Sequence, residues 1–236
     1  FKDSILGFVA GVQLTTNDML RIGDWVEMPK YNADGIVTEI TLNTVKVLNA
    51  NKTKVTIPAY ALVSDSFINW RGVHEVGARH IKRAIHIDSN TIGFCTDEMI
   101  EKFRKIKFLS DYMDQKLEEI QEFNANVENS SLLVNGRHLT NVGTFRIYLE
   151  NYIKNHPGIR KDMTIMVRQL APDEKGLPLQ IYAYSTTSVW VDFEKAQADI
   201  FDHIYAVAGE FGLRIFQAPS GYDLRTSIGE NEKEAM

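Results

Sequence analysis

Residues 21–28 read Arg-Ile-Gly-Asp-Trp-Val-Glu-Met. Ile22, Val26 and Met28 fall on one face of a two-residue period, which predicts a strand with one buried side. Working outward, three more strand-like runs follow at residues 35–42, 44–48 and 54–57, separated by Asn- and Gly-containing turns at residues 32–35 and 49–52. Pro58 ends the pairing because it lacks an N–H, and residues 67–70 predict a last short strand. Residues 19–72 therefore predict a small β-barrel of the Sm-like kind.

The segment before this module predicts an amphipathic helix over residues 1–14. Its large apolar residues recur at helical spacing and small residues lie among them: Phe1, Ile5, Phe8 and Val12, with Gly7, Ala10 and Gly11. A helix of this length reaches roughly 20 Å, short of the roughly 30 Å hydrocarbon core of a bilayer. It does not span a membrane alone, and packing on a soluble core is the alternative interpretation. Because the chain begins at Phe1 and not at Met, we expect it to be part of a longer protein.

The remainder predicts an α/β domain over residues 73–225 and a flexible acidic tail over 226–236. Strict alternation places Ile81, Ile85 and Ile87 on one side of a strand. The order that follows is strand, helices, hairpin, helix and strand, which is ferredoxin-like. The predicted elements are a strand at 79–88, helices from Asp97 and from Asp111, a loop at 124–135, a helix at 144–152, a hairpin of 163–170 with 177–185, a helix at 193–211 ended by Gly212, and a closing strand at 214–216.

Composition excludes several classes of protein. A net charge of −5 and a pI near 5.7 argue against a protein whose main partner is a nucleic acid. Cys95 is the single cysteine, so no internal disulfide forms and a reducing, cytoplasmic setting is expected. The six histidines are scattered, and no phosphate loop or nucleophile elbow occurs. We therefore expect no enzyme activity, no catalytic residues, no cofactor and no metal. Asp199, Asp202 and His203 share a helix and could hold a cation or form a catalytic pair, but a solvated or subunit-facing polar surface is favoured.

Four motifs in this order resemble the small-conductance mechanosensitive (MscS-like) channel family. They are a Ser-x-x-x-x-x-Ala-Gly helix at Ser4–Gly11, an Arg-x-Gly-Asp-Trp-Val strand at Arg21–Val26, a Gly-x-Val hairpin at Gly35–Val37, and Ile57-Pro58 before the last strand. Residues 139–146, 197–203 and 216–221 are similar to the longer YbdG-type (miniconductance) branch, which carries inserted residues, here near 107–142. The chain departs from the family where Asp18 and Met19 replace the usual basic residue and Pro, and where Gly7 replaces Asn.

The resemblance implies a homoheptameric channel of the bacterial inner membrane, with this portion facing the cytoplasm. Bilayer tension during hypoosmotic shock would open it and release ions and small solutes. Residues 1–18 would then be the end of the pore-forming helix. The implied site residues are Gly7, Ala10 and Gly11 for packing between pore helices, Ile5, Phe8 and Val12 for contact with lipid or neighbouring helices, and Arg21, Gly23, Asp24, Trp25, Gly35 and Pro58 for the barrel motif.

Two rival hypotheses come from other classes. One is an Sm-like RNA-binding ring, against which stand the acidic charge and the lack of a basic, aromatic face on the barrel. The other is a soluble oligomeric scaffold module, which is compatible with the α/β part alone. Under the channel hypothesis, Gly11→Leu is expected to shift the tension threshold without preventing assembly.

Overall fold

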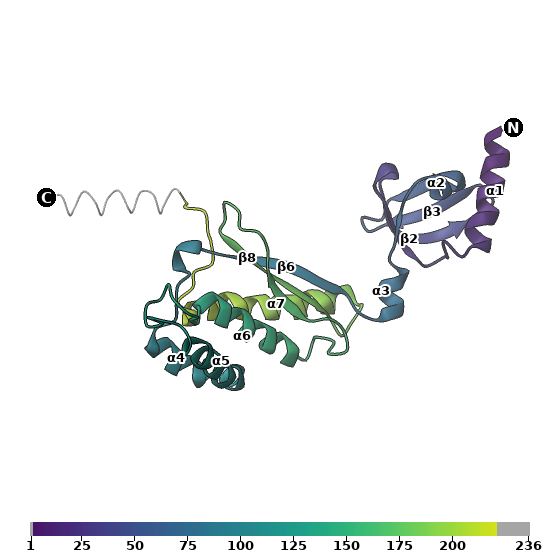
Figure 1. Ribbon diagram of the computed structural model, residues 1–236. Coiled ribbons are helices and arrows are strands. Elements are labelled where there is room, and N and C mark those ends of the chain that lie inside the picture. The colour runs from purple at the N-terminus through teal and green to yellow at the C-terminus, as the bar shows by residue number, and fades with distance from the viewer. Residues whose placement is uncertain (1, 221–236) are drawn as a thin grey trace. The chain divides into compact units, whose positions relative to one another are not determined.

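The computed structural model describes residues 2–220, and the chain divides into two compact units, Phe1–Gly77 and Ala78–Met236 (Figure 1). Helices and antiparallel sheets occur in both units, so the predicted α+β class is confirmed. The predicted tail at 226–236 lies outside the described residues.

The first unit is built on a five-stranded antiparallel sheet of order β4-β3-β2-β1-β5, on which helix α1 packs. Every predicted strand is present, although Ile22 precedes β1 and is exposed. Strands β4 and β5 are the edges, so the pairing gives an open sheet. Two short helices, α2 and α3, were not predicted. The elements are α1 (Lys2–Thr16), β1 (Trp25–Met28), β2 (Ala33–Ile40), β3 (Thr44–Asn49), β4 (Lys54–Pro58), α2 (Ala59–Ser64), β5 (Ile68–Asn69) and α3 (Arg71–Val76), with a 3-10 turn at Pro29–Tyr31.

Alternation along the strands builds the core of this unit. Side chains at every second position are buried, and Leu14 from α1 and Leu62 from α2 close the core from the helix side. The buried strand residues are Val26, Met28, Ala33, Val37, Val45, Val47 and Ile57.

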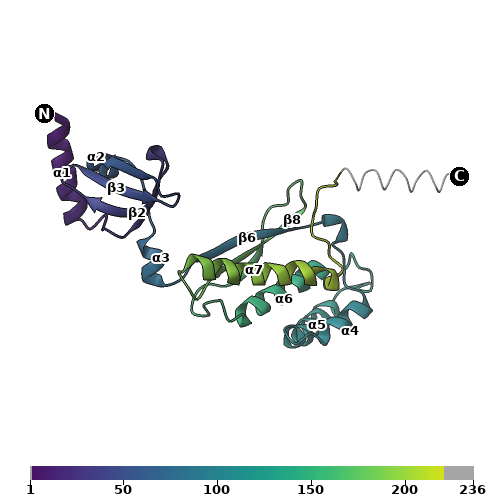
Figure 2. The same cartoon turned by 180° about the vertical axis from the view of Figure 1, so that it is seen from behind.

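The second unit is a three-stranded antiparallel sheet of order β6-β8-β7 with helices on one face. Its elements are β6 (His80–Ile87), α4 (Asp97–Arg104), α5 (Ser110–Asn124), α6 (Asn141–Asn155), β7 (Met166–Gln169), β8 (Leu177–Tyr184) and α7 (Trp190–Val207), with 3-10 turns at Ser89–Thr91 and Ala208–Phe211. Helices α6 and α7 lie directly below the sheet, and α4 and α5 lie farther from it, as both views show (Figures 1 and 2).

The closing strand at 214–216 is reduced to a single bridge between Ile87 and Ile215. The bridge lies beside β6, so the order becomes that of a ferredoxin-like sheet with a vestigial fourth strand. The prediction of a full strand was wrong, since only the Phe216 amide and the Arg214 carbonyl bond to the β6 end.

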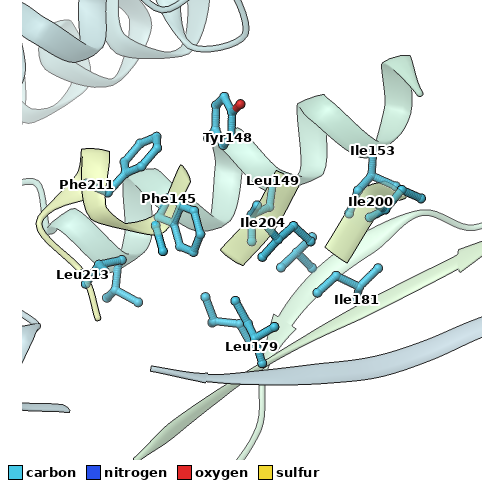
Figure 3. Close-up of a cluster of buried hydrophobic side chains, with 14 of the residues drawn as sticks. Phe145, Tyr148, Leu149, Ile153, Leu179, Ile181, Ile200, Ile204, Phe211 and Leu213 are labelled. Atoms are coloured by element: carbon cyan, nitrogen blue, oxygen red, sulfur yellow. The ribbon is translucent and has the colours of Figure 1, made fainter. Parts of the chain in front are cut away.

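One continuous apolar core joins this sheet to its helices. Figure 3 shows Leu179 and Ile181 of β8 facing Leu149 and Ile153 of α6 and residues of α7. Helix α6 begins earlier than predicted, at Asn141, because the Thr140 hydroxyl accepts from the Gly143 amide and caps it. It ends at Asn155, and the His-Pro-Gly sequence that follows breaks it as expected.

Candidate functional site

Helix α1 has two faces of opposite character. Its small face is buried on the sheet module and on α2, through Gly7, Ala10, Gly11 and Leu14. Its other face carries large apolar side chains that nothing in the described chain covers: Ile5 (63% exposed), Leu6, Phe8 (51% exposed), Val9 and Val12. Helix α1 therefore packs on the module through a face of mostly small residues and exposes a face of large apolar residues.

The two glycines set the distance between α1 and the β2–β3 turn. A Cβ at Gly7 would lie 3.0 Å from Cβ of Asn43, and a Cβ at Gly11 would lie 2.2 Å from the Leu42 carbonyl oxygen. Only glycine permits that approach. The family resemblance assigned Gly7, Ala10 and Gly11 to packing between pore helices, and that assignment stays a prediction. Within this chain, Gly7 and Gly11 approach the turn at Asn43 and Leu42.

The exposed face continues into an open groove beside α1. Its floor is formed by the end of β2 and the following turn, and Leu42 projects from it with 63% of its surface exposed. Sequence reasoning did not identify this extension. The lining residues are Gly11, Val12, Thr15, Thr16, Ile40, Thr41 and Leu42. The apolar surface thus spans the helix and the adjacent turn.

A buried carboxylate fastens the end of α1 to the sheet. Asp24 accepts hydrogen bonds from Arg71 Nη2 at 2.5 Å, from Asn69 Nδ2 at 2.9 Å and from the Arg21 amide at 2.8 Å. Burial alone raises the pKa of Asp24, but the hydrogen bonds from these three donors outweigh it and lower the pKa to about 2. Arg71 also bonds the Asp18 carbonyl, in the turn that ends α1. One charge cluster therefore joins the turn after α1 and the residue before β1 to β5 and α3.

The other predicted motif residues occupy structural positions in the same module. Gly23 has a φ of 96° and donates to the Val37 carbonyl. Trp25 Nε1 donates to Asp34 Oδ1 at 2.8 Å. Gly35 lies against β3, where a Cβ would meet the Leu48 carbonyl oxygen at 2.1 Å. Pro58 ends β4 and precedes α2.

Arg21 is exposed, and its side chain pairs with Asp18. Sequence reasoning missed Asn69 and Arg71, although the Asn-Trp-Arg run at the end of the last predicted strand, residues 67–70, was a usable signal.

The Asp199, Asp202 and His203 group does not form a cation site. Asp199 pairs with His156 at 2.9 Å, and His203 bonds the Tyr148 hydroxyl at 2.7 Å instead. Burial lowers the pKa of His203. Among the residues the structure describes, no cluster of His, Cys, Asp and Glu could hold a metal ion.

Cys95 is half-buried beside Thr144, and burial raises the pKa of its thiol. That environment does not activate a nucleophile, because the thiolate is disfavoured.

Two family profiles match the chain, one in each unit. The profile of the mechanosensitive ion channel β-domain matches residues 3–72, and that of the mechanosensitive ion channel MscS C-terminal region matches residues 148–215, together more than half of the chain. The chain belongs to the MscS-like family of mechanosensitive ion channels. Residues 73–147, which contain α4 and α5, lie between the two matched regions.

Individual relatives agree with the MscS-like assignment. The chain is 21% identical over 211 residues to the low conductance mechanosensitive channel YnaI of Escherichia coli (strain K12), covering 89% of this chain and 47% of YnaI. It is 31% identical over 90 residues to the MscS family protein YhdY of Bacillus subtilis (strain 168), covering 38% of this chain and 23% of YhdY. The chain thus spans less than half of these curated relatives. The predicted YbdG-type branch stays a prediction.

Solved structures share the fold. Arabidopsis thaliana MSL1 superposes with a TM-score of 0.60 at 12% identity, over 92% of this chain and 60% of that one. Helicobacter pylori MscS in its closed state superposes with a TM-score of 0.56 at 11% identity, over 93% of this chain and 66% of that one. Within residues 2–220, no helix combines the length and apolar character needed to cross a bilayer.

Proposed function

We propose that this chain is the inner-membrane-proximal and cytoplasmic portion of a bacterial mechanosensitive channel, a homoheptamer that opens under bilayer tension. The open channel would release ions and small solutes during hypoosmotic shock. The observation that carries the proposal is the exposed apolar face of α1, on a helix whose opposite face is docked on the family's β-domain. A folded module rarely leaves five large apolar side chains of one helix in water unless a membrane or a partner covers them.

In this mechanism α1 is the end of the pore-forming helix. Its face of Ile5, Phe8 and Val12 would contact lipid and neighbouring helices, while Gly11 and Leu14 hold it on the sheet. Tension favours the conformer with the larger in-plane area, so the populations of the closed and open states shift. The Asp24 cluster would make α1 and the sheet move together, because it bonds the turn that follows α1 to β5 and α3.

A patch-clamp recording of the full-length protein tests the gating directly. In a bacterial strain that lacks its other mechanosensitive channels, we expect tension-activated current in excised patches. Phe8→Asp should abolish or strongly shift this current, since a carboxylate on the apolar face is costly to bury. Gln13→Asp is the matched control, because Gln13 is a polar, exposed residue of the same helix. Absence of tension-activated current from well-expressed protein would refute the proposal, and equal effects of the two substitutions would refute the role of the α1 face.

A further inference from the structure

The second unit presents two surfaces of opposite charge. The first is the open sheet face, defined by His80, Lys82, Met166, Arg168, Tyr182 and Tyr184. Strand register places these side chains together, with Lys82 and Met166 each opposite Tyr182, and His80 opposite Tyr184. The strand positions of this face include no carboxylate, although the chain as a whole has a net charge of −5.

The open sheet face is preorganised. The His80 ring stacks on Tyr184 at 4.8 Å between centroids and meets the Tyr182 ring edge-on at 4.2 Å. Arg168 is held by Gln180 Oε1 at 2.7 Å, and Lys82 has no ion pair among the described residues. Within the described residues of the second unit, no helix covers this side of the sheet, since α6 and α7 lie on the other (Figures 1 and 2).

The second surface is the insertion surface, defined by Glu118, Glu122, Phe123, Leu132, Leu133 and Val134. The carboxylates of Glu118 and Glu122 lie four residues apart on α5, are exposed, and form no ion pair in the part of the chain that is described. The apolar side chains of Leu132, Leu133 and Val134, in the loop after α5, are exposed, and Val134 is 89% exposed.

Polar bonds hold this loop against α5. Asn124 accepts from the Arg137 amide at 2.7 Å and donates to its carbonyl at 2.8 Å, and the Arg137 side chain pairs with Glu119. The apolar loop and the acidic helix therefore form one surface.

We propose that the insertion surface of one chain docks on the open sheet face of a second copy of the same chain. Acidic side chains would meet Lys82 and Arg168, and the apolar loop would meet the aromatic rings. A ring built from one kind of subunit needs two different, complementary surfaces on each subunit, because its contacts are head-to-tail. The two surfaces meet that need: α5 lies on the helix side of the sheet, away from the open face (Figures 1 and 2). This inference rests on the proposed homo-oligomer and specifies the contact between its neighbouring subunits.

Paired cysteines in the full-length, detergent-purified protein test this contact, with Cys95 replaced by serine. We expect Leu133→Cys combined with Tyr184→Cys to form a ladder of disulfide-linked oligomers under mild oxidation. Each single cysteine variant alone should stay unlinked, because the contact joins unlike surfaces. A mixture of the two single variants should yield linked dimers only. An intact oligomer by native mass spectrometry without any ladder from the paired variant would overturn the proposal, as would equal linking by a single variant.

Charge reversal gives an independent readout. Combining Glu118→Lys with Glu122→Lys should raise the protein concentration at half-assembly by roughly three- to tenfold, since two exposed pairs become repulsive. Adding Lys82→Glu and Arg168→Glu should restore assembly. Lys54→Glu, an exposed lysine of the first unit, is the matched control. Failure of the second pair to rescue the first would contradict the charge pairing. These assays need no membrane tension. A channel that gates normally but forms no disulfide-linked oligomers would therefore refute this inference without contradicting the proposed function.

Discussion

Gly11→Ala is the substitution for which the structure gives the sharpest expectation. The added Cβ would lie 2.2 Å from the Leu42 carbonyl oxygen and 2.9 Å from its carbonyl carbon. Both atoms are backbone, so no rotamer change relieves the clash. The turn itself is held by the Thr44 amide bonding the Thr41 hydroxyl at 3.1 Å and by the Asn43 carbonyl accepting from Ala59 at 2.8 Å. Helix α1 must therefore move away by roughly 1 Å to reach an ordinary contact distance.

The magnitude follows from two opposing effects. Overpacking of a close contact costs about 1–3 kcal/mol, and the better helix propensity of alanine returns up to about 1 kcal/mol. We expect a net loss of about 1–2 kcal/mol in the stability of the first unit. Gly7→Ala should cost less, because its neighbour at 3.0 Å is the Asn43 side chain. Gly72→Ala in α3 is the matched control, since no atom lies within 4 Å of its Cβ position, and it should stabilise slightly.

Tryptophan fluorescence in a urea titration measures this effect in the full 236-residue chain. Trp25 and Trp70 both lie in the first unit, so a Trp190→Phe background makes the signal specific for that unit. The midpoint should fall for Gly11→Ala and hold or rise for Gly72→Ala. If the two alanine variants shifted the midpoint equally, the close approach of α1 to the turn would be refuted. The tension threshold predicted to shift in Gly11→Leu would then need another cause.

Three further predictions concern single side chains. Asp24 has a pKa of about 2 in the fold against 3.8 in the unfolded chain, so its contribution is present above pH 3.8 and is lost as the pH falls toward 2. Asp24→Asn should lower the free energy of unfolding by about 2 kcal/mol at pH 7, measured by urea titration, and should weaken its decrease at acidic pH. Glu75→Gln, at an exposed position, should leave the decrease at acidic pH unchanged. Cys95 should react with maleimide far more slowly at pH 7 in the folded chain than in urea, because burial raises its thiol pKa; equal rates would contradict that environment. Gly176→Ala should lower the unfolding temperature by several degrees, since φ is 97° and its Cβ would meet the Ile87 carbonyl oxygen at 2.2 Å; an unchanged temperature would argue against this hairpin geometry.

Periodicity located most elements because the core lies on one side of each sheet. In the first unit, alternation at Val45 and Val47 matches burial on a half-covered sheet. In the second unit, the stripe of Phe193, Ile200 and Ile204 correctly marked the buried face of α7. The short helix α2 was missed because its six residues are too few to show a helical period.

Sequence periodicity predicted only part of the candidate site. Sequence spacing found the apolar residues of α1, and the structure confirms that Ile5, Phe8 and Val12 are exposed. Sequence spacing did not identify Arg71 as the partner of Asp24. The two residues are 47 positions apart, and the pairing of β1 with β5 brings them together.

The sequence by itself determined the family, the α+β class and the amphipathic character of α1, because motifs and periodicity are local properties. Only the tertiary structure decided which surface the small face of α1 contacts. Gly7 and Gly11 permit a close approach to any backbone, and the fold brings the turn at Leu42 and Asn43 there. The proposed pairing of unlike surfaces in the second unit likewise depends on which side of the sheet its helices cover. Long-range packing fixes such contacts, and no residue spacing encodes them.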